Sequence, residues 1–471
     1  MNKTKKNARG ITLIALVITT IVLLILAGVA IAALSGDNGI LTRAKEAKEK
    51  TAQAQKEEEK TLSNMENMVG VYNFKNVNKS DTNPGETVPE NSSVLENDAN
   101  EGIVIKDRNN NEWVWVEVPK TTVFSGLTID TSKELTEQNY NDIKNKMINY
   151  AQKYREGKSG QGCNWTDEWY AEDGEELVTA STSNLTETQK ALTNGCGLTY
   201  DEYKTAYQKM LKSVYTYGGF WIGRYEAGIE GSITDLTKAR TGGTGRPGGT
   251  TGPVSYDGTS VKVLKLATVT TQSDNTNTLP KAISQKDAIP YNWVTCSEAQ
   301  SLAKEMTPNS NYTSSLMFGI QWDLVCKYLE EKGGLSVSDI KQDSSSWGNY
   351  CNAKIENITA GKYAILDTIT WKLGEWTKIT SAFTKSDWGD NSSVLLSTGI
   401  SEYTKKINIY NFASNEAERT LEKTSSSDDP CARRGGSCSN IGSDFPASFR
   451  CDDYTALSGE DIGFRPALYA N

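Results

Sequence analysis

The chain has 471 residues and contains no histidine, which excludes catalytic or metal sites that depend on an imidazole, such as Ser-His-Asp triads and His-ligated zinc. Its 50 basic residues are outnumbered by 59 acidic ones, and the net charge of −9 argues against binding nucleic acid over a broad surface. Only 37% of the residues are hydrophobic, while Asn, Ser, Thr, Gly, Tyr and Trp are plentiful. This composition is typical of an extracellular binding or adhesive surface.

The N-terminus combines a basic leader, residues 1–10, with an uncharged apolar run over residues 11–34. At ~1.5 Å per residue this run is long enough, as a helix, to cross the ~30 Å hydrocarbon core of a bilayer. A cleaved signal peptide is the alternative, but its apolar region is usually shorter. We therefore predict a single-pass anchor that contacts membrane lipid. Basic flanks stay cytoplasmic, so everything after Ser35 should lie outside.

The junction of these two segments, Arg9-Gly10-Ile11 followed by apolar residues, resembles the prepilin cleavage and methylation motif. The resemblance implies that a prepilin peptidase cuts after Gly10 and leaves Ile11 as the first residue of a retained helix. Pilins that assemble generally carry Glu at the fifth mature position, which here is Ala15. The departure favours processing and anchoring over assembly into a fibre.

Two polar segments follow the apolar run. Residues 35–69 are rich in Ala, Glu, Lys and Gln and predict an exposed helical spacer. Residues 70–100 are polar and contain prolines, which is typical of a flexible linker. All 11 Trp lie beyond both segments, so we assign the folded domain to residues 101–471.

The start of this domain predicts a β-hairpin, with strands at 103–105 and 113–116 and a turn at 107–111. Alternating Asp and Asn in the turn resemble the beginning of a calcium loop. An EF-hand loop needs Gly at its sixth position and Glu at its twelfth, and the chain has Glu112 and Val118 there. The pattern therefore indicates a turn and not a metal site.

Helical spacing of apolar residues predicts helices over 200–211, 297–306 and 322–329, with a β-rich segment at 219–226. Their aromatic stripes indicate core packing. The mixture predicts an α+β fold with much irregular loop. The eight cysteines contain no C-x-x-C pair, which argues against a zinc site, and whether they are thiols or disulfides stays open.

Six segments, in chain order, resemble the formylglycine-generating enzyme (sulfatase-modifying factor) family. They are Phe220–Glu226, Ile289–Trp293, Gly319–Asp323, Asn408–Ala413, Arg433–Ser437 and Gly463–Arg465. The resemblance implies an irregular domain related to the C-type lectin fold, here placed behind an N-terminal transmembrane α-helix.

The same resemblance identifies what the chain lacks. Enzymes of the family hold copper with two cysteine thiols a few residues after Gly-Gly-Ser, at places that fall near Asn440 and Phe445, whereas this chain has Cys438 and Cys451. The related iron-dependent sulfoxide synthases need histidines. We therefore expect no catalytic residues, no metal and no cofactor.

Variable proteins of diversity-generating retroelements use this scaffold for binding, and the C-terminal region 431–468 is similar to their display region. The structural frame would be Arg434, Gly435, Gly436, Gly463, Phe464 and Arg465. The displayed, ligand-binding residues would be Cys438, Ser439, Asn440, Asp444, Phe449, Asp452, Asp453, Tyr454, Glu460 and Asp461. An ordinary polar loop that caps the domain is the alternative.

These features predict a non-catalytic, membrane-anchored surface protein, adhesin- or receptor-like, that binds an unknown external protein or glycan. Its N-terminus would be cytoplasmic and its C-terminal domain extracellular, on the cell surface or a pilus. Two alternatives remain: a minor pilin or pseudopilin with a structural role, and a cysteine-dependent oxidase of the formylglycine-generating type.

Overall fold

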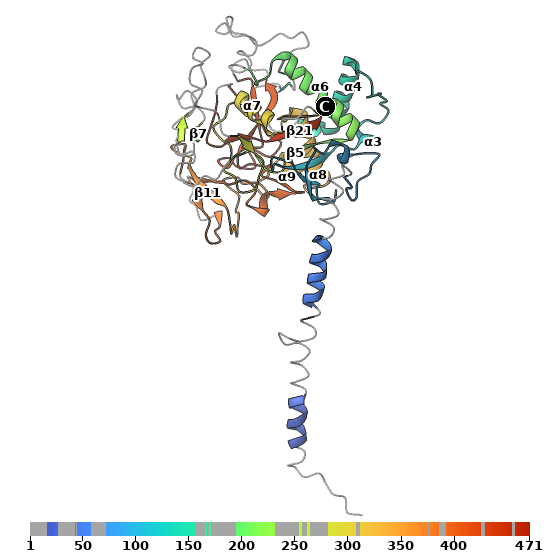
Figure 1. Ribbon diagram of the computed structural model, residues 1–471. Coiled ribbons are helices and arrows are strands. Elements are labelled where there is room, and N and C mark those ends of the chain that lie inside the picture. The colour runs from blue at the N-terminus through green and yellow to red at the C-terminus, as the bar shows by residue number, and fades with distance from the viewer. Residues whose placement is uncertain are drawn as a thin grey trace, which may run out of the picture. The chain divides into compact units, whose positions relative to one another are not determined.

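The computed structural model divides the chain into two compact units, Met1–Met65 and Glu66–Asn471. The residues that it describes are 17–26, 43, 45–57, 72–155, 165–166, 169–170, 195–230, 254–256, 261–263, 281–307, 311–374, 376–385, 392–424, 429–454 and 457–471. In the smaller unit, residues 17–26 and 45–57 are helical, and all of them are exposed (Figure 1). The second of these helices falls within the segment expected to form an exposed spacer.

The helix at residues 17–26 occupies the middle of the run predicted to anchor the chain. Its apolar side chains, from Val17 to Leu26, are exposed by about half or more. The rest of residues 11–34, together with Gly10, lies outside the described residues. Among the residues that the structure describes, no helix is both long and apolar enough to cross a membrane.

The larger unit is built on an antiparallel six-stranded sheet. Its strands, in spatial order, are β1 (Ser93–Glu96), β2 (Val104–Lys106), β3 (Glu112–Glu117), β5 (Gly219–Gly223), β21 (Pro466–Ala470) and β10 (Tyr312–Leu316). All residues of β5 and β21 are buried, because helices and loops cover both faces of the sheet centre. The last strand of the chain thus pairs with a strand formed some 240 residues earlier, Leu468 opposite Trp221.

Three helices form where the apolar spacing predicts them. They are α6 (Tyr200–Tyr217), α7 (Cys296–Met306) and α8 (Gly319–Glu331). Capping boxes begin α6, with Thr199 and Glu202, and α7, with Thr295 and Glu298, so side chains satisfy the first backbone N–H groups. The remaining helical segments are α3 (Lys120–Val123), α4 (Glu137–Arg155), α9 (Val337–Lys341) and the 3₁₀ turns η1 (Pro84–Thr87) and η5 (Glu402–Thr404).

The predicted hairpin is confirmed by β2 and β3. In the turn between them, Asp107 Oδ1 accepts hydrogen bonds from the backbone N–H groups of Asn109 (2.8 Å) and Asn111 (2.9 Å). The indole of Trp113 donates to the other oxygen of Asp107 at 2.9 Å. Asp107 therefore holds the turn together as an Asx turn does.

The prediction of a flexible linker over 70–100 is wrong for the described residues 72–100. Phe74, Val88 and Val94 are buried in an apolar cluster beside the central sheet. The indoles of two sheet tryptophans also find their acceptors here: Trp115 donates to Thr82 Oγ1 at 2.8 Å and Trp221 to Thr87 Oγ1 at 2.9 Å. The polar composition of this segment did not predict its packing, because only a few apolar residues hold it against the domain.

A second sheet carries most of the C-terminal region. Its strands are β19 (Arg450–Asp453), β18 (Cys431–Arg434), β17 (Ala417–Thr424) and β20 (Ile462–Phe464), with β4 (Trp165–Thr166) paired to β17. The third sheet contains β12 (Lys372–Leu373), β11 (Lys362–Asp367), β13 (Thr377–Lys378) and β14 (Ser392–Leu396). Two-stranded pairs join β6 (Gly228–Ile229) to β9 (Ala282–Ile283), β7 (Val254–Tyr256) to β8 (Val261–Val263), and β15 (Lys405–Lys406) to β16 (Ile409–Tyr410). The α+β class is confirmed.

Candidate functional site

The C-terminal region is positioned by β18, which lies between β17 and β19. The chain leaves β18 through Gly435 and Gly436, whose φ angles are +84° and +70°. A Cβ atom on Gly436 would also lie 2.7 Å from the backbone oxygen of Phe445. Both positions therefore require glycine, and they turn the chain sharply into the loop that follows.

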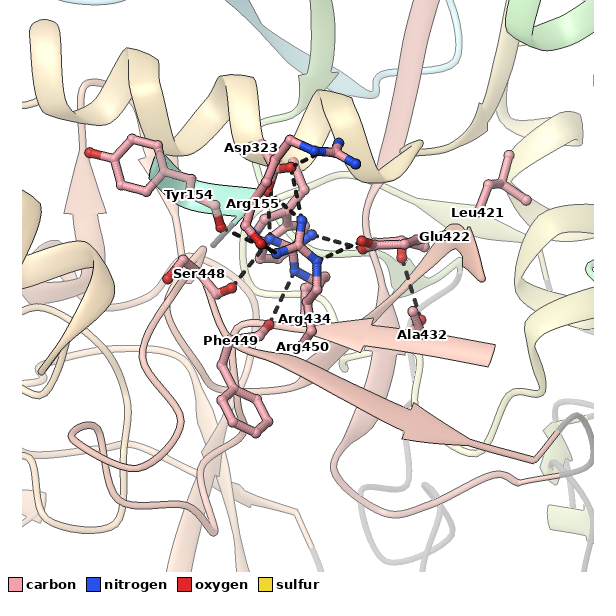
Figure 2. A network of polar contacts seen from close by, with 12 residues as sticks. Tyr154, Arg155, Asp323, Leu421, Glu422, Ala432, Arg434, Ser448, Phe449 and Arg450 are labelled. Carbon is pink, nitrogen blue, oxygen red and sulfur yellow. Dashed lines mark hydrogen bonds and ion pairs between the residues drawn. The ribbon is translucent and has the colours of Figure 1, made fainter. Parts of the chain in front are cut away.

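Arg434, the residue before these glycines, lies in a completely buried ion-pair network with Arg450 (Figure 2). Arg434 contacts Asp323 and Glu422, both at 2.8 Å. Arg450 contacts the same two carboxylates, at 2.9 and 2.6 Å. Buried charges are tolerated when they are paired and fully hydrogen-bonded, as here. The network joins β17, β18 and β19 to helix α8.

The network is completed by α4. Arg450 donates to the backbone oxygens of Tyr154 (3.2 Å) and Arg155 (2.6 Å) at the end of that helix. Burial alone would raise the pKa of Glu422, but the adjacent Arg450 and Arg434 outweigh it and lower that pKa. Glu422 is therefore ionised at neutral pH. Paired charges thus hold the strands from which the C-terminal loops extend.

The second frame arginine, Arg465, is also completely buried. Its side chain contacts Glu418 at 2.7 Å and donates to the backbone oxygens of Gly223 (2.9 Å) and Tyr410 (2.8 Å). Phe464 beside it packs near Tyr291, with ring centroids 5.9 Å apart. The two motifs chosen as frame thus flank the intervening loop with buried, hydrogen-bonded arginines.

The ten residues expected to be displayed divide by exposure. Five are buried: Cys438, Phe449, Asp453, Glu460 and Asp461. Four are half-buried, Ser439, Asn440, Asp452 and Tyr454, and Asp444 is exposed. Only the four half-buried residues and Asp444 have side-chain surface that a ligand could contact in this conformation.

Several of the buried or half-buried members hold the loop in place. Asp461 accepts hydrogen bonds from the hydroxyls of Ser437 and Ser439, both at 2.6 Å. Asn440 Oδ1 accepts from the backbone N–H of Ser437 at 2.9 Å. Asp453 pairs with Arg419 at 2.8 Å. These groups give the loop a defined shape, a role that the alternation of residue types in the sequence did not reveal.

The surface between these residues contains a very small hollow. It is lined by Ala417, Arg433, Gly436, Asn440, Phe445, Phe449 and Cys451, and its volume is about 10 Å³. This is about the space that one water molecule needs, and far below the ~300–1,000 Å³ of sites that enclose small organic ligands. This hollow is therefore too small to enclose an organic ligand.

Two thiols of this region, Cys438 and Cys451, are the cysteines nearest in sequence to the places where the family resemblance implies copper ligands. Cys438 is completely buried, and burial raises its pKa well above the usual value. Burial also raises the pKa of Cys451, against the opposing effect of Arg433. Burial therefore favours the protonated thiol at both positions in the metal-free protein. In the described part of the chain, no three His, Cys, Asp or Glu side chains come together as a metal site.

One buried acid near this region escaped the sequence reasoning. Glu226 is completely buried, and its Oε1 accepts hydrogen bonds from the side chains of Asn411 (3.0 Å) and Asn415. Its Oε2 has no hydrogen-bond partner. Burial, with a further contribution from Glu418, raises the pKa of Glu226 to about 8. Glu226 ends the motif Phe220–Glu226, and nothing in that motif distinguishes a buried acid from an exposed one.

Comparison with known proteins adds no identification: no protein-family model matches the chain, and no curated protein matches it.

Proposed function

We propose that this chain is a membrane-anchored surface protein that binds an external ligand through its C-terminal face, without catalysis. The scaffold would be a formylglycine-generating-enzyme-like domain used as in the variable proteins of diversity-generating retroelements. Residues 11–34 would anchor it in the membrane after processing at Gly10. The ligand would be a protein or a glycan outside the cell.

One observation carries the proposal. Asn440, Asp444, Asp452 and Tyr454 present polar and aromatic surface between two buried arginine motifs that fix the surrounding backbone. A recognition surface works best when its contact residues project from a rigid support, because less conformational entropy is then lost on binding. We name these four residues the accessible set; Ser439 is left out because its hydroxyl donates to Asp461 at 2.6 Å.

The shape of the face supports binding over turnover. Its hollow of about 10 Å³ leaves no room for a substrate side chain. The two nearby thiols, Cys438 and Cys451, both have raised pKa values, which disfavours the thiolate that an oxidase of this kind would use. Polar side chains together with aromatic ones are typical of protein recognition sites.

The apolar character of residues 17–26 supports the anchor. Each of the large apolar side chains in this helix is exposed, a costly arrangement in water that contact with lipid acyl chains would remove.

The test randomises the four codons of the accessible set in the full-length chain and selects the library for binding to one arbitrary protein, hen egg-white lysozyme. We expect folded variants in quantity and lysozyme binders among them. The matched control randomises four buried positions of the same region, Cys438, Asp453, Glu460 and Asp461, and should yield mostly unfolded chains. A first library that fails to fold, or folds and yields no binders, contradicts the proposal.

A further inference from the structure

Helices α4 and α6 enclose a pocket of about 250 Å³, on different elements from the C-terminal face. Each helix contributes residues spaced three and four apart, so each presents one face to the space between them. The lining residues are Glu137, Tyr140, Asn141 and Lys144 of α4, Tyr200, Tyr203, Lys204, Tyr207, Gln208 and Leu211 of α6, and Tyr170. The apolar spacing of α6 predicts that part of this stripe packs in the core. Tyr203 and Tyr207 are indeed buried, and they form the inner wall of the pocket.

Five of the eleven lining residues are tyrosines. The rings of Tyr203 and Tyr207 lie nearly parallel, 14° apart in plane and 6.1 Å between centroids. Tyr170 meets Tyr200 and Tyr203 edge-on, at 5.6 and 5.8 Å. Such rings offer a rigid, flat and weakly polar surface.

Polar side chains gather at the mouth. Glu137 Oε1 contacts Lys204 Nζ at 2.8 Å and accepts from Gln208 Nε2 at 3.0 Å. Glu137 and Lys204 are 65% and 41% exposed, so solvent reaches this rim. The rim therefore combines a carboxylate, an amide and an ammonium, which supply both hydrogen-bond acceptors and donors.

We propose that this pocket binds one neutral pyranose ring of a carbohydrate. A pyranose has a face of C–H groups that stacks on an aromatic ring, and a rim of hydroxyls that both donate and accept hydrogen bonds. The tyrosine wall and the Glu137–Lys204–Gln208 rim match these two features. The volume is slightly below the ~300–1,000 Å³ of pockets for larger organic ligands, which suits a single ring.

The charges argue against the other ligand of aromatic cages, a quaternary ammonium ion. Lys204 Nζ already lies 6.0 Å from the centroid of the Tyr200 ring, and Lys144 also lines the pocket, so the lining contains two lysines. The negative charge of Glu137 is balanced by its ion pair with Lys204. A neutral ligand therefore fits the site better than a cation.

The test measures saturation-transfer NMR signals from methyl glycosides of glucose, galactose, mannose and N-acetylglucosamine with the full-length chain. The detergent should be a polyoxyethylene ether, because maltoside and phosphocholine detergents would carry competing sugar or choline groups. We expect at least one glycoside to bind saturably. Absence of a signal from all four, or stronger binding of choline than of any glycoside, overturns the proposal.

Two variants locate the binding. Tyr200→Ala removes a half-buried ring at the first residue of α6, and Gln208→Ala removes a rim amide; each should weaken binding by about fivefold to tenfold. Lys212→Ala, on α6 but outside the pocket, is the matched control and should bind as the parent does. If both pocket variants retain the parent's affinity, the sugar binds elsewhere and the assignment fails. Alanine at Asp444, Asp452 and Tyr454 should not affect this binding, so the test is independent of the proposed function.

Discussion

Arg465 and Glu418 meet in the interior of the larger unit through three hydrogen bonds. Arg465 Nε lies 3.1 Å from both oxygens of the carboxylate, and Nη2 lies 2.7 Å from Oε1. Neither side chain is exposed by more than 1%. The remaining guanidinium hydrogen bonds are to backbone oxygens of β5 and β16. Arg465, which lies between β20 and β21, thus connects β17 to two further strands.

Replacing Arg465 by Ala should lower the free energy of unfolding by about 3–5 kcal/mol, because Glu418 would remain buried with its main partner removed. Urea unfolding followed by tryptophan fluorescence measures the change. Arg108→Ala, at an exposed position in the hairpin turn, is the control and should stay within about 0.5 kcal/mol of the parent. A small effect at Arg465 would show that the frame does not depend on this pair.

The accessible side chains should behave in the opposite way. A combined Asp444→Ala, Asp452→Ala, Tyr454→Ala variant removes one exposed and two half-buried side chains and should lower stability much less than Arg465→Ala does. Asn440→Ala should cost somewhat more, about 1 kcal/mol, since its side chain accepts from the backbone of Ser437. Thermal melting curves compare the two. Unfolding of the triple variant would mean that the interval is core and would contradict the display interpretation.

The thiols give a prediction about copper. The full-length chain should bind no stoichiometric copper(I) in competition with a chelator, and it should not oxidise the cysteine of a peptide substrate. The reason is that burial raises the pKa of both Cys438 and Cys451. Tight copper binding that disappears in Cys438→Ser or Cys451→Ser would revive the oxidase alternative.

The basic leader and apolar run predict the topology. The chain should fractionate with membranes, and protease added to intact cells should cleave the tryptophan-rich domain. Gly10→Leu should abolish N-terminal shortening, measured by mass spectrometry of the purified chain, because a prepilin peptidase cuts after this glycine. A domain protected from protease would contradict the orientation, and unchanged processing of Gly10→Leu would exclude this peptidase.

Local pattern predicted the elements of the core well. The turn at Asp107, the stripe of α6 and the β5 strand each depend on neighbours within a few residues, which a sequence displays directly. Composition did not predict the packing of residues 72–100, because four buried apolar residues and two indole hydrogen bonds hold that polar segment against the domain. The two indole hydrogen bonds join residues more than 30 positions apart.

For the candidate site, the sequence predicted the structural frame but not which residues of the intervening loop are exposed. Arg434 and Arg465 were identified as structural residues by motif, but their partners Asp323 and Glu418 carry no mark in the sequence. Within the interval, polar residue type could not separate Asp453, which is paired and buried, from Asp444, which is exposed. The tyrosine pocket was not predicted, because the spacing of its residues on α6 is also that of an ordinary core-packing helix.

Glu226 predicts how stability depends on pH. Its pKa is raised from 4.5 to about 8, so between these values the folded state retains a proton that the unfolded state has released. Stability from this group is therefore highest below pH 4.5, falls as the pH rises toward 8, and is constant above that.

The Glu226→Gln variant stays neutral at every pH, while its amide oxygen can still accept from Asn411 and Asn415. In urea unfolding, the variant should gain stability relative to the parent as the pH rises from 5 to 8, by at least about 1 kcal/mol in total. Glu101→Gln, at an exposed position, is the control and should show no such trend. A difference between Glu226→Gln and the parent that does not change with pH would mean that Glu226 is ionised in the folded protein.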